Sequence, residues 1–71
     1  METVLRQLGE NVRHHRDAAG ISQEELASRA KLDRSLISEI ENAKNLVRID
    51  TLVKLSRGLA IPLDLLMRDI A

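Results

Sequence analysis

The sequence contains no cysteine and no aromatic residue, and each absence narrows what the protein can be. Without cysteine there are no disulfides and no cysteine-ligated metals, which fits a reducing cytosol. Without aromatic residues the core has to consist of leucine, isoleucine, valine and alanine, a composition that suits packed helices better than a sheet. The same absence argues against binding of single-stranded nucleic acid, because such proteins stack bases on aromatic rings.

Long apolar runs and net charge are also lacking. No stretch approaches the roughly 20 apolar residues of a membrane span, and the first residues do not resemble a signal peptide. The formal net charge of the 71 residues is zero. Between Arg29 and Arg57, however, seven basic residues face four acidic ones, so the middle of the chain carries three excess positive charges. We expect one cytoplasmic domain over residues 1–71, without membrane contact.

Apolar periodicity and turn residues predict five helices and no strand. The first helix spans about Thr3–Ala19, and Gly20 ends it in the left-handed conformation. Ser22–Glu25 predicts a capping box, in which each end side chain bonds the backbone amide of the other. Further helices are predicted at 23–30, 34–41, 49–57 and 62–70. Asp33 is expected to cap the third helix, and Gly58 to end or loosen the fourth, giving a compact all-α five-helix bundle.

The second and third helices carry the functional interpretation. Each has about eight residues and about three residues separate them, so they must cross steeply, as in a helix-turn-helix. Ala27 is small enough for a close approach, and Leu32 and Ile37 can fill the angle. The outer face of the third helix is then free to enter the major groove of B-DNA. The candidate base-reading residues on that face are Arg34, Ser35, Leu36, Ser38 and Glu39.

Each candidate also has a structural alternative. Arg34 can pair with guanine O6 and N7 or remain a solvated cation, and a cation is slightly unfavourable at a helix N-terminus, which favours function. Glu39 can accept from cytosine N4, repel a wrong base, or hold Arg34. Leu36 can contact a thymine methyl or pack against the second helix. Ser35 and Ser38 can bind DNA or be neutral surface residues.

Three segments carry a family resemblance. GISQEELA (20–27), LDRSLISEIEN (32–42) and DTLVKLS (50–56) resemble the Cro/C1-type helix-turn-helix family of phage repressors. LDRSLISEIE is especially similar to controller proteins of restriction–modification systems. The resemblance implies a lambda-repressor-like DNA-binding domain that regulates transcription, bacterial or phage-encoded and associated with the nucleoid.

The resemblance also implies roles for single residues. Arg34, Ser35 and Glu39 match base-reading positions. Arg16 and Glu41 match a buried ion pair between the first helix and the end of the third. Gln23, Asn42 and Lys44 match contacts to the DNA backbone, and nearby surface residues add to them. The full set of expected phosphate contacts is Gln23, Arg29, Lys31, Asn42, Lys44, Asn45 and Arg48.

The chain departs from the family pattern in its turns. Lys31 stands where glycine or asparagine is usual, and Ala43 where glycine is usual. A left-handed backbone at either position costs roughly 1 kcal/mol in a residue other than glycine. Leu46 and Val47 replace a polar residue and a proline.

A surplus of apolar residues predicts a homodimer. One recognition helix reads few base pairs, whereas two helices related by a two-fold axis, about 34 Å apart, read a palindrome. A bundle this small cannot bury every apolar side chain of its last helix. The alternative is that this helix is simply well buried and its end frays. The predicted interface is Leu46, Val47, Ile61, Leu63, Leu66, Met67 and Ile70.

No arrangement for catalysis or metal binding is visible. His14 and His15 are adjacent, so their side chains point about 100° apart on a helix and cannot easily share an ion. No enzyme activity, metal, cofactor or small-molecule ligand is expected in a chain too small for a sizeable pocket. The competing interpretation is an antitoxin-like module whose last helix binds a partner protein. Copurification with a partner, and a monomer when alone, would support that alternative.

Overall fold

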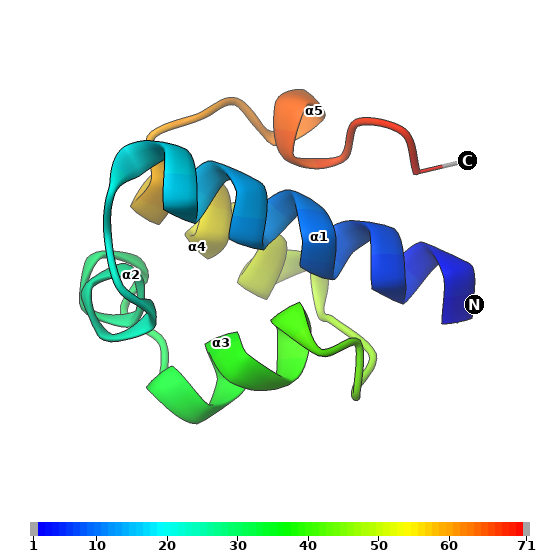
Figure 1. Cartoon of the computed structure of the whole chain (residues 1–71), viewed down its shortest axis with the longest axis horizontal. Coiled ribbons are helices and arrows are strands. Elements are labelled where there is room, and N and C mark those ends of the chain that lie inside the picture. Colours follow the sequence, from blue (N-terminus) through cyan, green and yellow to red (C-terminus); the bar gives the residue numbers. More distant parts are fainter. Residues whose placement is uncertain (1, 71) are drawn as a thin grey trace.

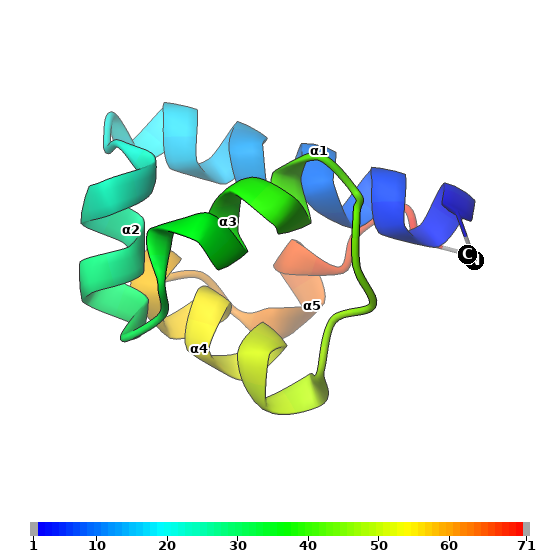
Figure 2. The ribbon, with the colours of Figure 1, turned by 90° about the horizontal axis from the view of Figure 1, so that it is seen from below.

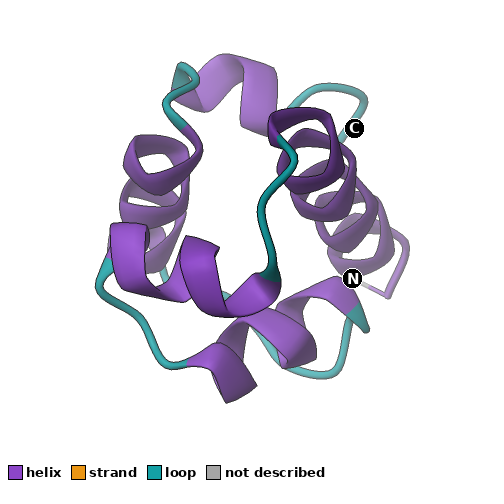
Figure 3. Cartoon of the chain, turned by 60° about the vertical axis from the view of Figure 1, so that its left-hand side comes forward, coloured by secondary structure: helices purple, strands orange, loops and turns teal. Residues whose placement is uncertain are grey.

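Five α-helices pack around one apolar core. The structure, a computed structural model, describes residues 2–70, and no strand occurs in this part of the chain (Figure 3). The helices are α1 (Glu2–Ala19), α2 (Gln23–Ala30), α3 (Arg34–Glu41), α4 (Ile49–Leu59) and α5 (Leu63–Leu66). In Figure 1, α1 crosses the middle of the molecule, with α3 below it, α4 behind it and α5 above it. The all-helical bundle expected from the composition is confirmed.

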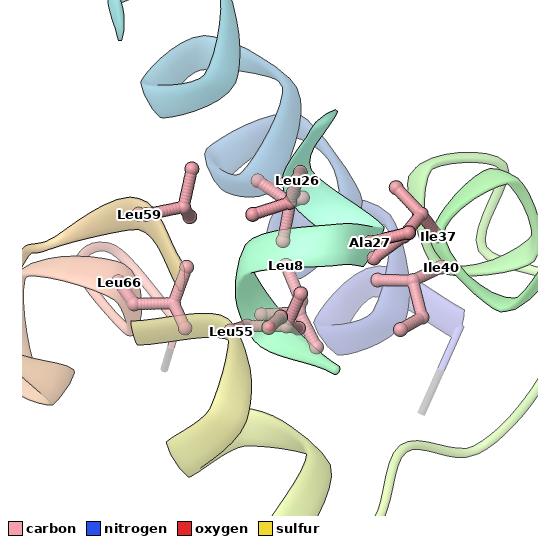
Figure 4. Close-up of a cluster of buried hydrophobic side chains, with 10 residues drawn as sticks. Leu8, Leu26, Ala27, Ile37, Ile40, Leu55, Leu59 and Leu66 are labelled. Atoms are coloured by element: carbon pink, nitrogen blue, oxygen red, sulfur yellow. The ribbon is translucent and has the colours of Figure 1, made fainter. Parts of the chain in front are cut away.

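α2 and α3 cross steeply, as the short connection between them predicts (Figure 2). Ala27 of α2 is 5% exposed, and Ile37 and Ile40 of α3 are 0% and 1% exposed. Their side chains meet within one cluster with Leu26 (Figure 4). Fully burying a leucine or isoleucine contributes roughly 1.5–3 kcal/mol, so this cluster holds the two helices in one orientation. The opposite face of α3 is consequently turned outward.

The helix caps contain fewer side-chain hydrogen bonds than the sequence predicts. Ser22 Oγ accepts a hydrogen bond from the Glu25 amide at 3.0 Å, which is half of the predicted capping box. The other half is missing, because the Glu25 carboxylate instead accepts from Arg29 Nε at 2.9 Å. Asp33 occupies the N-cap position of α3, but its side chain makes no capping hydrogen bond. Gly20 has φ 70° and ends α1 as predicted.

α4 continues through Gly58 and ends two residues later than predicted, at Leu59. Gly58 serves packing: a Cβ atom at this position would lie 2.8 Å from the Cβ of Ala30 on α2. Ala60, which has φ 58°, is the residue that ends α4. The glycine that was expected to end a helix therefore allows two helices to approach.

α5 is much shorter than the predicted helix over 62–70, since it covers only Leu63–Leu66. The side-chain amide of Asn11, on α1, donates to the backbone carbonyls of Leu66 and Arg68, at 2.8 Å each. These carbonyls accept from α1 and not from the next helical turn. The chain beyond α5 therefore lies along α1 as a series of turns (Figure 1).

Candidate DNA-binding surface

The first turn of α3 presents Arg34 and Ser35 to solvent. Both residues are exposed, and within residues 2–70 neither forms an ion pair or a side-chain hydrogen bond. Seen from below, the ribbon of α3 lies in front of the rest of the bundle (Figure 2). The donors of both side chains are thus available to an external partner.

The last turns of α3 differ, because the following loop folds back on them. Asn42 Nδ2 donates to the Ser38 backbone carbonyl at 2.8 Å. Asn45 Nδ2 donates to Glu39 Oε1, also at 2.8 Å. Ser38 and Glu39 are half-buried as a result. Glu39 is held by Asn45 and not by Arg34, so the suggestion that Glu39 holds Arg34 is wrong.

The side chain of Leu36 faces the interior of the protein. It is half-buried and packs against the hydrophobic core, as does Leu32 from the turn before α3. This corresponds to the packing alternative for Leu36. We therefore remove Leu36 from the candidate base-reading residues, which leaves four polar or charged side chains on the outer face of α3.

A buried carboxylate connects three helices behind this face. The Glu41 side chain, at the end of α3, is 0% exposed. Arg16 of α1 donates to both carboxylate oxygens, with Nε to Oε2 at 2.7 Å and Nη2 to Oε1 at 3.1 Å. Gln23 Nε2 of α2 donates to Oε1 at 3.1 Å, and Arg13 Nε of α1 lies 3.4 Å from the same atom. The ion pair implied by the family resemblance is present, and two further donors extend it.

The ionisation of Glu41 follows from this arrangement. Burial disfavours the charged carboxylate, but hydrogen bonds from Arg16, Gln23 and Arg13 outweigh it, so the pKa of Glu41 lies below its usual range. The hydrogen bond to Glu41 likewise raises the pKa of Arg16. Both groups are charged at neutral pH, and each is the principal partner of the other.

The expected phosphate contacts surround α3. Gln23 uses one amide hydrogen on Glu41, and the second hydrogen of that nitrogen remains to donate elsewhere. Lys31 and Lys44 are exposed and form no ion pair within the described residues. Arg29 and Arg48 are exposed but pair with neighbouring carboxylates, at 2.9 Å from Glu25 and 3.1 Å from Asp50 respectively. The two lysines are therefore the freest cations beside α3.

Lys31 and Ala43, the two turn residues that depart from the family pattern, both adopt the left-handed backbone conformation. Lys31 has φ 58° between α2 and α3, and Ala43 has φ 56° after α3. A side chain other than glycine is strained in this region. Despite this strain the Ala43 amide bonds the Ile40 carbonyl at 3.1 Å, so the turn after α3 is closed.

The predicted dimer residues separate into exposed and buried groups. Leu46 is 73% exposed and Leu63 is 38% exposed. Leu66 is 0% exposed and belongs to the core (Figure 4), so assigning it to an interface was wrong: α5 turns this side chain inward. Ile49, at the first position of α4, is 76% exposed and was missed. Its position at the very start of the helix, ahead of the first buried residue of α4, could have indicated that its side chain is exposed. The remaining four residues are half-buried against the core: Val47, Ile61, Met67 and Ile70.

Among residues 2–70, no group of three histidine, aspartate or glutamate residues is arranged to hold a metal ion. None of the five helices described is long and apolar enough to span a membrane.

Comparisons with known proteins agree with this geometry. The sequence model described as helix-turn-helix matches residues 12–66. Control protein C.MunI from a Mycoplasma species is 42% identical over 55 residues, which cover 78% of this chain and 74% of that protein. The restriction–modification controller protein C.AhdI from Aeromonas hydrophila has 35% identity and a TM-score of 0.85, covering 87% of this chain and 94% of that one. C.Esp1396I, crystallised as a tetramer with its natural 35 base-pair operator, has 28% identity and a TM-score of 0.84, covering 94% and 93%.

Proposed function

Because the chain belongs to the helix-turn-helix family, we propose that it is a cytoplasmic transcriptional regulator that binds a palindromic double-stranded DNA operator as a homodimer. One observation carries the proposal: Arg34 and Ser35 project without side-chain partners among residues 2–70, from a helix whose other end is locked to α1 and α2 through Glu41. The relatives that are control or controller proteins support a narrower role, control of the genes of a restriction–modification system.

In this proposal α3 enters the major groove with its first turn leading. Arg34 is placed to donate to guanine O6 and N7, the commonest specific contact in such complexes. Lys31 and Lys44 flank α3 in sequence on either side and would neutralise phosphates, which positions the helix without reading sequence. Gln23 adds a hydrogen bond from the start of α2, with its amide oriented by Glu41.

The homodimer would bury the exposed apolar side chains. Leu46 lies in the loop before α4 and Ile49 is the first residue of α4, and each is more than 70% exposed. Such a pair on a small domain is typical of an interaction surface. A two-fold axis beside it would duplicate α3, which a palindromic operator requires. We include Ile49 in the proposed interface and omit Leu66.

The test is selection of bound sequences from a random DNA pool, followed by titration of wild-type protein and the Arg34→Ala variant. We expect one palindrome to be enriched. Arg34→Ala should weaken binding to it by about 1–3 kcal/mol while changing binding to random DNA little. Affinity for both DNAs should fall steeply with salt.

Two outcomes would contradict the proposal. Equal weakening on both DNAs would show that Arg34 reads no base. Sedimentation that finds a monomer on a saturated operator would exclude the homodimer. Ser28→Ala, an exposed change on α2 outside the proposed contacts, is the matched control and should bind like wild type.

A further inference from the structure

The loop after α3 is attached to the outer face of that helix by an asparagine. We infer that Asn45 is a positioning residue that sets the base preference of Glu39, and is not the phosphate contact that the sequence suggested. The inference rests on the proposed function, since it concerns how the same α3 surface would read DNA. Its basis is the 2.8 Å hydrogen bond from Asn45 Nδ2 to Glu39 Oε1.

The chemistry of this bond leaves one carboxylate oxygen for the DNA. An ionised carboxylate only accepts hydrogen bonds, so the amide nitrogen of Asn45 is the atom that must face it. Oε1 is occupied by that donor, whereas Oε2 has no partner among the residues described. The Asn45–Glu39 hydrogen bond lies at an exposed position, so the carboxylate can be reached from outside. The pair therefore presents a single acceptor with a defined direction.

A fixed acceptor selects a base that donates at the matching place. Cytosine offers its N4 amine in the major groove and adenine its N6 amine, whereas guanine offers only acceptors there and thymine offers an acceptor and a methyl group. A freely rotating carboxylate could turn away from a guanine or thymine oxygen. A carboxylate held by Asn45 cannot do so without losing a hydrogen bond, so a wrong base meets unrelieved repulsion. Asn45 thereby converts a flexible side chain into a discriminating one.

The loop does not depend on Asn45 for its conformation. The Lys44 amide donates to the Glu39 carbonyl at 3.0 Å, and Asn42 Nδ2 donates to the Ser38 carbonyl at 2.8 Å. Both bonds join the loop to α3 through the backbone of α3, and neither involves Asn45. Asn45 is itself exposed, so replacing it removes no core contact. A substitution at this position therefore tests the side-chain bond without displacing the loop.

The experiment compares Asn45→Ala with Lys44→Gln on the selected operator and on operators substituted at each base pair. Glu39→Ala is measured first. The operator position at which this variant no longer prefers one base pair is the position that Glu39 reads. We expect Asn45→Ala to reduce the preference at that position roughly five- to tenfold, with little change at other positions. Glu39→Ala with Asn45→Ala should lose no more preference than Glu39→Ala alone.

Lys44→Gln supplies the contrasting pattern of a phosphate contact. It should weaken all operators by the same factor and reduce the slope of log affinity against log salt by about one. Asn45→Asp, which replaces the donor by a second acceptor, should lose at least as much preference as Asn45→Ala. Circular dichroism of each variant checks that the fold is retained.

Several results would overturn the inference. If Asn45→Ala weakens every operator equally, Asn45 is a phosphate contact after all. If Glu39→Ala keeps every base preference, Glu39 reads no base and Asn45 positions nothing. Either result can occur while Arg34→Ala still abolishes its own preference, so the inference can fail while the proposed function stands. Absence of any preferred operator for wild-type protein would contradict both.

Discussion

The two ends of α3 are built differently, although only four residues lie between Arg34 and Glu39. At the N-terminal end, the side chains of Arg34 and Ser35 have no hydrogen-bond partner in the described part of the chain, and the Asp33 side chain does not cap the helix. At the C-terminal end, Ser38 and Glu39 accept from the following loop, and Glu41 accepts from two other helices. One end is free and the other is held.

This difference assigns separate tasks to the two ends. The free side chains can donate hydrogen bonds to DNA without breaking a bond within the protein. Ordering the long arginine side chain nevertheless costs conformational entropy. The held end has already lost that entropy during folding, so it positions the whole helix and limits which base it accepts. Substitution of Glu41, which joins the held end to α1 and α2, should therefore change stability, whereas Arg34→Ala should act on DNA binding.

The largest expected effect comes from removing the carboxylate at the held end. Glu41→Ala leaves Arg16, whose side chain is 13% exposed, without its principal partner. Loss of one member of a buried ion pair costs about 3–5 kcal/mol. The total stability expected for a domain of this size is only about 4–10 kcal/mol. Urea denaturation should show this loss, whereas Glu10→Ala, an exposed change on α1, should stay within about 0.5 kcal/mol.

Acid provides an independent check on the same residue. The pKa of Glu41 is lowered in the folded protein, so its ionisation contributes stability that is present above the ordinary glutamate pKa of about 4.3. That contribution is lost as the pH falls through the lower folded-state value. The stability difference between wild type and Glu41→Ala should therefore shrink below about pH 4. A difference that is independent of pH would show that the charge of Glu41 is unimportant.

A smaller effect is expected where α1 touches the held end. A Cβ atom on Gly9 would lie 2.6 Å from the Ile40 carbonyl oxygen and 2.8 Å from that of Glu41. Alanine normally stabilises a helix interior by about 1 kcal/mol relative to glycine. Overpacking against a backbone costs more, so Gly9→Ala should destabilise the protein by about 1–3 kcal/mol net. Thermal unfolding shows whether Gly9→Ala is stabilised or destabilised relative to wild type. A stabilised variant would show that α1 and α3 are not in close contact.

Much of the recognition region was predictable because its signals are local. The bounds of α2 and α3 follow from Ser22, Asp33 and the apolar spacing, and the inward Ile37 and Ile40 determine which face of α3 points outward. The family pattern added the Arg16–Glu41 pair, whose members are 25 residues apart and carry no local signal.

The remainder depends on contacts between distant segments. Gly58 lies within α4, where its lack of a side chain leaves room for Ala30 of α2. α5 ends at Leu66, whose carbonyl accepts from Asn11 of α1, as does the carbonyl of Arg68 beyond it. The Asn45–Glu39 bond depends on a loop conformation that hydrophobic periodicity does not describe. The role of Leu36 was ambiguous because the side chain of a residue at the edge of a helix face can turn toward the core or toward solvent.

The smallest effect should come from the turn that follows the held end, where Ala43 has φ 56°. Glycine tolerates this backbone, but it also loses more entropy on folding, so Ala43→Gly should stabilise the protein by at most about 1 kcal/mol. Ala18→Gly, at an exposed helical position of α1, provides the opposite case and should destabilise by up to about 1 kcal/mol. Opposite shifts of the urea midpoint would confirm that strain is stored beside the hydrogen-bonded end of α3. Shifts of the same sign would mean that the turn relaxes, and that the Asn42 side chain and the Lys44 amide hold the loop on α3 without backbone strain.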